Sequence, residues 1–213
     1  FYISVIEING SHAHRFDSLT QKLGIPTLII TDIDAQEERL EKGELKWKSA
    51  IPQKNKKQKT NNDTIKHWLK IESIDMLLEL PFPNKQRGNI CISYQTPISV
   101  NWTNQKKEDE LYEVYPYTFE DSLVFTNIKL FQSDEKMAKM GVITTFYNYL
   151  KKAISLEDFH EKMFSCLEKR KNVKASFATD ILCTEQFDKI QAPSYIKEGL
   201  IWLQKCLNNK IRK

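Results

Sequence analysis

The chain has 213 residues, a formal net charge of +4 at pH 7, and 40% hydrophobic against 28% charged residues. This composition excludes an intrinsically disordered protein and suffices for a globular domain with a sizeable core. No apolar run approaches the roughly 20 residues that span a bilayer, so we expect no membrane segment and no membrane partner. The mildly basic charge permits nucleic-acid binding without indicating it.

The four cysteines are widely separated and form no C-x-x-C pair. Such spacing predicts neither a structural zinc site nor a disulfide framework, and it fits a reducing, cytoplasmic environment. These cysteines are Cys91, Cys166, Cys183 and Cys206.

The beginning of the chain predicts a strand, a helix and a second strand. Residues 3–7 (ISVIE) have the composition of a strand, and residues 14–24 form a short amphipathic helix that Gly24 would end. The apolar run at residues 27–31 follows directly and predicts a buried strand. The three segments together predict a βαβ unit, whose crossover should be right-handed.

The second predicted strand ends in the sequence TDID, with Asp32 and Asp34 one residue apart. The continuous run of Leu28, Ile29 and Ile30 suits a parallel strand covered on both faces. Ligands of open α/β sheets bind at the carboxyl ends of the strands, and side chains two residues apart on an extended segment point the same way. Two like charges placed together repel unless a cation lies between them, so the pair predicts a cation site. The alternative is a helix N-cap followed by a solvated loop acid.

Lysines are concentrated between Lys42 and Lys59, in a stretch that is also rich in Gln and Asn. The stretch has neither a helical nor a strand period, which predicts a solvated loop. The alternative is a loop that contacts phosphate groups beside the acidic pair. In either case we expect no part in the chemistry.

Helices dominate the remainder of the chain, with one further strand at residues 89–96 (NICISYQT). This order of elements predicts an α/β fold with a mostly helical C-terminal part. The predicted helices cover residues 60–70, 73–80, 118–131, 156–170, 174–184 and 194–207.

Two of these helices begin with charged residues. Thr118 is a predicted N-cap, and Glu120 and Asp121 fall in the first turn that follows, where negative charge is favourable. Lys174 starts a later helix, and its positive charge opposes the helix dipole unless an anion compensates it.

Seven segments, taken in order, resemble the TOPRIM nuclease half of the overcoming-lysogenisation-defect (OLD) family of ATP-dependent endonucleases, which includes Gabija-like antiphage nucleases. The resemblance spans Val5 to Leu203 and is weakest across the lysine-rich stretch and residues 130–170. A D-x-D motif is common by itself, but the ordered set of D-x-D, FED and K-x-x-F-A is much more specific. The segments are VIEINGSHAHRF, LGIPTLIITDID, TNNDTIKHWL, SYQT, YTFEDSL, KASFATDIL and APSYIKEGLIWL.

The resemblance implies a fold and an activity. It implies a TOPRIM-like, Rossmann-like parallel sheet flanked by helices in residues 1–130, and a helical part in residues 131–213 that completes the nuclease domain. It also implies an endonuclease that hydrolyses DNA by a two-metal mechanism with Mg²⁺ or Mn²⁺. ATP would act only through an ATPase domain of the same polypeptide, outside this chain, and a homo-oligomer is expected.

Residue by residue, the resemblance implies that Asp32 and Asp34 are metal ligands. The acidic residue of the family's S/T-x-E step falls on Glu120, as a ligand and a catalytic residue, with Thr118 in the hydroxyl position. Asp121 is a neighbouring candidate ligand. Such oxygen ligands suit Mg²⁺ or Mn²⁺ rather than zinc.

The catalytic basic residue of the family falls on Lys174. An ammonium group there would act as a point charge on the phosphoryl group in the transition state. This role would also explain a cation at the start of a helix, where the dipole otherwise disfavours it.

One member of the family pattern is not matched. TOPRIM sites also use a glutamate at the end of the first strand, and a helix, a second strand and another helix normally follow it before the D-x-D strand. Only one predicted helix separates Glu7 from the D-x-D strand, so Glu7 matches the second strand better than the first. We therefore expect the first strand and its glutamate upstream of Phe1. If that glutamate is absent, the alternative function is a catalytically incomplete TOPRIM-like module for assembly or nucleic-acid binding. A haloacid-dehalogenase phosphatase also begins with a strand and D-x-D, but it requires Thr or Val where this chain has Gln36.

Overall fold

The computed structural model describes residues 2–8, 11–103, 109–133, 141–169 and 172–211. They form two compact units, which are considered separately below. Unit 1 contains Phe1–Thr96 and Ser194–Lys213, and unit 2 contains Pro97–Pro193. The C-terminal helix thus returns to the N-terminal unit, whereas the sequence motifs suggested a division after residue 130. Within the described residues, no helix is long and apolar enough to cross a membrane.

Unit 1 is built on a short mixed sheet, which confirms the α/β class. Strand β1 (Thr27–Ile30) pairs in parallel with β6 (Ile90–Ser93), and β5 (Gln86–Arg87) pairs antiparallel with the other edge of β6. All four residues of β6 are buried, as expected for the central strand of a covered sheet. Because β1 and β6 are parallel, their carboxyl ends lie at the same edge.

Six helical segments complete unit 1, and their ends follow local capping rules. Gly24 ends α1 in the left-handed conformation and donates its N–H to the carbonyls of Thr20 and Gln21, as predicted. The predicted helices at residues 60–70 and 73–80 are confirmed as α2 and α3. The segments are η1 (Ala13–Phe16), α1 (Asp17–Leu23), α2 (Asp63–Leu69), α3 (Ile74–Glu79), η2 (Phe82–Lys85) and α9 (Ser194–Ile211).

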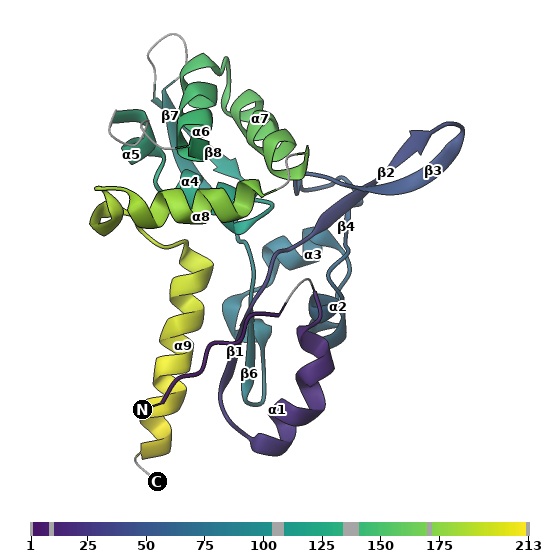
Figure 1. Ribbon diagram of the computed structural model, residues 1–213. Coiled ribbons are helices and arrows are strands. Elements are labelled where there is room, and N and C mark those ends of the chain that lie inside the picture. Colours follow the sequence, from purple (N-terminus) through teal and green to yellow (C-terminus); the bar gives the residue numbers. More distant parts are fainter. Residues whose placement is uncertain (1, 9–10, 104–108, 134–140, 170–171, 212–213) are drawn as a thin grey trace. The chain divides into compact units, whose positions relative to one another are not determined.

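Helix α9 packs directly on β1 and β6 (Figure 1). The close approach depends on Gly199, which is buried in the helix. A Cβ atom at this position would lie 2.7 Å from Cδ1 of Leu28 and 3.2 Å from Oγ of Ser93. The Ser93 hydroxyl also donates a hydrogen bond to the carbonyl of Tyr195. The C-terminal helix therefore covers the two parallel strands.

The predicted strand at residues 3–7 is wrong. Residues 2–8 form no strand, and Tyr2 and Val5 are more than nine-tenths exposed. The parallel partner of β1 is β6, so the expected βαβ unit of residues 3–31 is not present. A β-branched run becomes a strand only where an edge pairs with it, and composition alone does not provide that edge.

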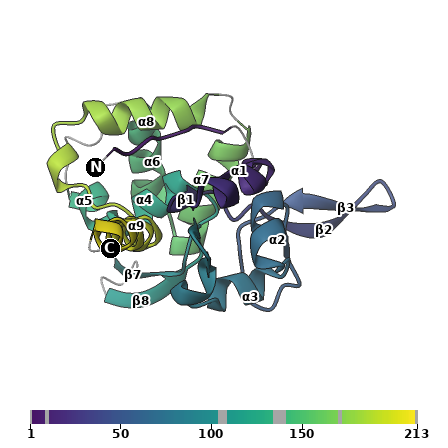
Figure 2. The same ribbon diagram turned by 90° about the horizontal axis from the view of Figure 1, so that it is seen from below.

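The lysine-rich stretch is also different from the prediction, because much of it forms a β-hairpin. Strands β2 (Ala35–Glu41) and β3 (Glu44–Ser49) pair antiparallel, and β4 (Lys59–Thr60) pairs with the other edge of β2. The turn residues Lys42 and Gly43 both have positive φ, as a type I′ hairpin turn requires. The hairpin projects from the body of unit 1, beyond α2 and α3 (Figures 1 and 2).

The strands of the hairpin are mostly exposed and rich in charged residues. Leu40 stands opposite Leu45, and Glu38 stands opposite Trp47. The charged side chains pair with one another: the ion pairs are Lys48 with Glu41 at 3.1 Å, Lys46 with Glu44 at 3.3 Å, and Arg39 with Glu37 at 2.8 Å. Acids thus offset Lys46 and Lys48 of the hairpin. Lys54, Lys56 and Lys57 lie between β3 and β4, outside the hairpin, and the alternative that this stretch contacts phosphate groups stays a prediction.

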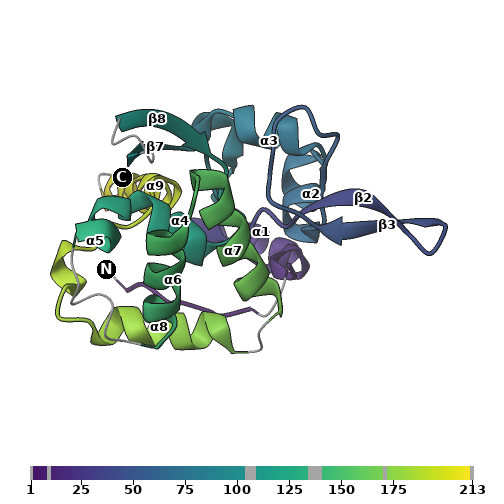
Figure 3. The ribbon, with the colours of Figure 1, turned by 90° about the horizontal axis from the view of Figure 1, so that it is seen from above.

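Unit 2 combines an antiparallel strand pair with a helical core. Strands β7 (Ile98–Thr103) and β8 (Asp109–Val114) were not predicted, although β7 alternates buried residues, such as Val100 and Trp102, with exposed polar ones, as a strand with one covered face does. The helices are α4 (Phe119–Thr126), α5 (Ile128–Ser133), α6 (Gly141–Lys152), α7 (Leu156–Lys169), α8 (Val173–Cys183) and η4 (Phe187–Lys189). Helix α6 packs against both α7 and α8 (Figures 1 and 3).

Aromatic side chains fill the core of unit 2. Phe125, Phe131, Phe146, Phe159 and Phe177 are each at most 2% exposed. They lie on α4, α5, α6, α7 and α8, so each of these helices contributes one ring. This core fixes the start of α4, where Glu120 and Asp121 lie.

Candidate metal site

The loop after β1 carries the acidic pair of unit 1. Pairing with β6 continues to Thr31, whose N–H donates to the carbonyl of Ser93 at 3.0 Å. Ile33 then points into the core with no exposed surface, while Asp32 and Asp34 remain partly exposed. Asp34 has a positive φ of 49°, a conformation that aspartate tolerates better than most residues. Strand β2 begins at Ala35, so the alternative that these acids cap a helix is wrong.

A buried glutamine holds Asp32. Gln95 follows β6, and its Nε2 donates to Oδ1 of Asp32 at 2.7 Å. Its Oε1 accepts the backbone N–H of Ile33 at 2.8 Å. The glutamine is only 1% exposed, so its amide is fixed by these contacts rather than by water. Sequence reasoning left Gln95 without a role in this site.

A buried asparagine holds Asp34 in the same way. Asn62 is the N-cap of α2, where its Oδ1 accepts the N–H of Ile65 at 3.1 Å. Its Nδ2 lies 2.7 Å from Oγ1 of Thr31, 2.7 Å from the carbonyl of Asp32 and 3.1 Å from Oδ2 of Asp34. One fully buried side chain therefore connects the acidic loop to the start of a helix.

Thr60 completes the contacts of the loop. Its hydroxyl donates to the carbonyl of Ile33 at 2.6 Å, and the carbonyl of Asp34 accepts the N–H of Asn61 at 2.8 Å. The backbone between Asp32 and Asp34 is thus held by two neighbouring segments of unit 1. Thr60 and Asn61 lie in the TNNDTIKHWL segment of the family resemblance, but the sequence does not indicate which groups they contact.

The second predicted acidic group lies at the start of α4, in unit 2. Thr118 is the N-cap, as predicted, and it forms a capping box with Asp121, the third helical residue, which was not predicted. Thr118 is fully buried, and Glu120 is 7% exposed. The prediction that Glu120 joins Asp32 and Asp34 in one cluster spans the two units and stays a prediction.

The carboxylate of Asp121 accepts hydrogen bonds from the turn that surrounds it. Its oxygens accept the N–H groups of Tyr117, Thr118 and Ser122 at 2.8 to 3.0 Å, and the hydroxyl of Thr118 at 3.2 Å. The fifth donor is Nε2 of His160 on α7, at 3.0 Å from Oδ2. Asp121 is fully buried, and these five donors hold its carboxylate within the turn. Its role as a metal ligand stays a prediction. His160 went unnoticed in the sequence because it lies 39 residues away.

Lys174 is the second residue of α8, in unit 2, and its side chain is exposed. The N-cap of this helix is Asn172, in the left-handed conformation. The predicted helix and the position of the lysine within its first turn are confirmed. Its role in chemistry stays a prediction.

A third carboxylate lies at the surface of unit 1. Asp17 begins α1 and accepts Nε2 of His67 at 2.8 Å, Nε2 of Gln21 at 2.6 Å and Nε1 of Trp68 at 3.2 Å. The hydrogen bond from His67 is the largest of several effects that lower the pKa of Asp17 below its usual value. This acid ties α1 to α2.

The donor set of the acidic loop fits a hard divalent cation. Asp32 and Asp34 offer carboxylate oxygens, which Mg²⁺ and Mn²⁺ prefer, from a loop that backbone and amide contacts hold in place. Across the described residues, no three His, Cys, Asp or Glu side chains are grouped so that they could hold a metal ion. The acidic loop of unit 1 therefore contributes two carboxylates, those of Asp32 and Asp34, to the candidate metal site.

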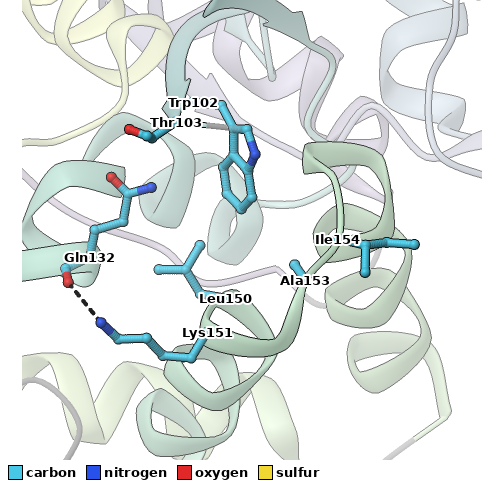
Figure 4. Close-up of a pocket in the computed structure, with 7 residues that line it drawn as sticks. All are labelled: Trp102, Thr103, Gln132, Leu150, Lys151, Ala153 and Ile154. Carbon is cyan, nitrogen blue, oxygen red and sulfur yellow. Dashed lines mark hydrogen bonds between the residues drawn. The ribbon is translucent and has the colours of Figure 1, made fainter. Parts of the chain in front are cut away.

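Unit 2 also contains a pocket of about 290 Å³, between β7 and helices α5 and α6 (Figure 4). The Nζ of Lys151 donates to the carbonyl of Gln132 at 3.4 Å across it. Among the described residues, no acidic side chain lines this pocket, so it offers no carboxylate for a cation. The lining residues are Trp102, Thr103, Gln132, Leu150, Lys151, Ala153 and Ile154.

Comparison with known proteins gives two matches. The family model for the TOPRIM domain of overcoming-lysogenization-defect-like proteins matches residues 1–34. Endonuclease GajA of Bacillus cereus (strain HuB5-5) is 30% identical over 215 residues, which cover 99% of this chain and 28% of that relative. The chain therefore spans less than a third of the length of the relative. No solved structure matches it significantly.

Proposed function

Because these matches confirm the resemblance to OLD-family TOPRIM domains, we propose that the chain is the nuclease part of a metal-dependent DNA endonuclease. The observation that carries the proposal is the Asp32–Asp34 loop, where two partly exposed carboxylates follow a parallel strand. The family match ends at Asp34 and so includes this loop. The relative is itself named an endonuclease.

In this proposal Asp32 and Asp34 hold divalent cations through their carboxylate oxygens, and Glu120 supplies a third carboxylate. Bound Mg²⁺ or Mn²⁺ would activate a water molecule and neutralise charge on the phosphoryl oxygens. Thr118 and Asp121 act behind Glu120, since their capping box sets the first turn of α4. The expectation that both of them also bind metal stays a prediction.

Lys174 is proposed to stabilise negative charge that develops on the phosphoryl group. It lies in the first turn of α8, where an ammonium group is disfavoured unless an anion is near. A group that meets charge only as the charge develops lowers the reaction barrier without tightening the binding of the ground state. The lysine should therefore affect the cleavage rate more than DNA affinity.

The wider setting is proposed from the same relative. We propose that unit 1 is the core of a TOPRIM-type parallel sheet flanked by helices, with β1 and β6 as neighbouring strands. The parent polypeptide would contain an ATPase domain through which ATP acts, form a homo-oligomer and serve antiphage defence. The described cysteines are all free thiols, which suits a cytoplasmic protein.

A second candidate is a TOPRIM-like module without catalysis, used for assembly or nucleic-acid binding. The observation that favours it is Glu7, which lies in the exposed segment 2–8 outside any strand. The two candidates differ in whether phosphodiester bonds are cut.

The test uses the intact parent protein, supercoiled plasmid DNA, and Mg²⁺ or Mn²⁺ with and without ATP. We expect cleavage that depends on the metal and that stops when the metal is chelated. Lys174→Ala should lower the cleavage rate by a factor on the order of 10² or more, with DNA affinity within a few fold of the parent. The control Lys189→Ala, another exposed lysine of unit 2, should change neither. DNA binding without any cleavage would favour the second candidate.

A further inference from the structure

We propose that Gln95 and Asn62 are positioning residues that orient the Asp32 and Asp34 carboxylates toward a divalent cation. The inference rests on the proposed function, because it assigns these aspartates to a metal site. It goes further in assigning a role to two neutral, buried side chains, Asn62 of the TNNDTIKHWL segment and Gln95 of the SYQT segment, for which the resemblance implied none. Both lie in unit 1, together with the acids that they contact.

The amide of Gln95 has one possible orientation. Its Oε1 accepts the N–H of Ile33, so its Nε2 must face Oδ1 of Asp32 at 2.7 Å. A flipped amide would set an NH₂ group against an N–H donor and an oxygen against a carboxylate, and both contacts are repulsive. The hydroxyl of Tyr195 on α9 lies 3.5 Å from the same nitrogen. Backbone and helix together thus fix the direction of the N–H that Asp32 receives.

The amide of Asn62, like that of Gln95, has one possible orientation. Its oxygen is occupied by the N–H of Ile65, as the cap of α2 requires, so its nitrogen faces the acidic loop. This nitrogen reaches the carbonyl of Asp32 and the Oδ2 of Asp34. The side chain is fully buried, and the capping contact prevents a rotation that would release Asp34.

Neutral donors suit a cation site better than charged ones. A lysine or arginine at either position would cancel a negative charge that a cation needs, whereas a carboxamide orients the carboxylate and leaves its charge in place. Groups behind the ligands of metal sites characteristically fix ligand orientation in this way. The positive φ of Asp34 adds a reason for the contacts, because a residue in that region needs support from its surroundings.

The chain contains a matched control, Gln58. It is 2% exposed, its Oε1 accepts the N–H of Gln53 at 2.8 Å, and its Nε2 reaches the carbonyl of Ile51 and Oε2 of Glu37. It is therefore a buried glutamine of unit 1 that bridges a backbone N–H and a carboxylate, and the hydrogen bonds named here join it to residues outside the acidic loop. A purely structural role would make Gln58 and Gln95 behave alike.

The experiment measures Mn²⁺ binding to the intact parent protein, in the absence of DNA, by electron paramagnetic resonance titration, with thermal unfolding recorded alongside. Gln95→Met should weaken Mn²⁺ binding about tenfold or more, the range typical of groups behind metal ligands. Gln58→Met should lower the unfolding temperature by a similar amount but change Mn²⁺ affinity less than about twofold. Asn62→Ser keeps a good N-cap, so it remains testable if Gln95→Met fails to fold, and it too should weaken Mn²⁺ binding.

Asp32→Asn separates this inference from the function on which it rests. If Asp32→Asn abolishes a Mn²⁺ site that Gln95→Met and Asn62→Ser leave intact, the positioning role is wrong and the proposed function stands. Equal loss of affinity in the Gln95 and Gln58 variants would also overturn the positioning role. If Asp32→Asn itself binds Mn²⁺ as the parent does, the metal site of the proposed function is wrong, and this inference fails with it.

Discussion

The chain places aspartates in two tight segments and uses their carboxylates in opposite ways. In the loop after β1, amide side chains contact single oxygens of Asp32 and Asp34, and both acids remain partly exposed. In the turn before α4, five donor atoms converge on Asp121, which is fully buried. A carboxylate surrounded by donors stabilises the fold, whereas one that is oriented but accessible can bind a ligand.

The largest effect expected from this comparison is on stability, at Asp121. Asp121→Ala removes the acceptor of the backbone N–H groups of Tyr117 and Thr118 and of the His160 ring nitrogen. Because these buried groups would lose their partner, the substitution should lower the free energy of unfolding by about 3 to 5 kcal/mol. Chemical denaturation of the parent protein and the variant would measure the loss. A variant as stable as the parent but unable to bind Mn²⁺ would reverse the comparison and return Asp121 to the metal site.

The next effect is on activity, at Asp32. Asp32→Asn keeps the size of the side chain but removes its charge, and it should lower metal-dependent cleavage by a factor on the order of 10² or more. Stability should change little, since the side chain is partly exposed. Plasmid cleavage and thermal unfolding, measured on the same preparations, give the two numbers. A large loss of stability here would erase the difference between the two acidic segments.

A smaller effect is expected where α9 supports the strands below the acidic loop. Gly199→Ala would bring a Cβ atom to 2.7 Å from Cδ1 of Leu28, and we expect a destabilisation of about 1 to 3 kcal/mol. The control is Leu200→Ala, at a neighbouring position that is half exposed. Denaturation should separate the two variants. Equal stability would mean that α9 shifts easily and does not hold the edge that carries Asp32.

The smallest effect is expected at Asp17, a surface carboxylate that accepts several hydrogen bonds, as Asp121 does, but is partly exposed, as Asp32 and Asp34 are. Because its pKa is lowered in the folded state, mainly by His67, the stabilisation is present above the unfolded pKa of about 3.9 and is lost as the pH falls through the folded pKa. Asp17→Asn should therefore destabilise the protein by less than about 1 kcal/mol at pH 7, and by less still near pH 3. Denaturation of both proteins at the two pH values checks this. A difference that does not shrink in acid would assign the effect to packing.

Local features of the fold were predictable because their causes lie within a few residues. Gly24 ends α1 and the N-cap Thr118 begins α4, as their positions in the sequence indicate. In contrast, the β2–β3 hairpin is rich in charged, exposed residues and was predicted as a loop, and residues 3–7 looked like a strand that has no partner among the described strands. Propensity describes what a segment can do, and pairing decides what it does.

The same division applies to the candidate site. By itself the sequence determined that two aspartates follow a strand, that Glu120 and Asp121 open a helix, and that Lys174 lies in a first helical turn. The predicted burial of that strand on both faces is wrong, because β1 is only partly buried and Ile30 is 49% exposed. Only the tertiary structure decided that β1 pairs with β6 and that Gln95 and Asn62 reach the acidic loop. It also decided that Asp121 is enclosed by its turn and His160. The physical reason is distance along the chain: helix caps are hydrogen bonds between near neighbours, whereas Gln95 meets Asp32 across 63 residues, and no local pattern encodes a contact of that kind.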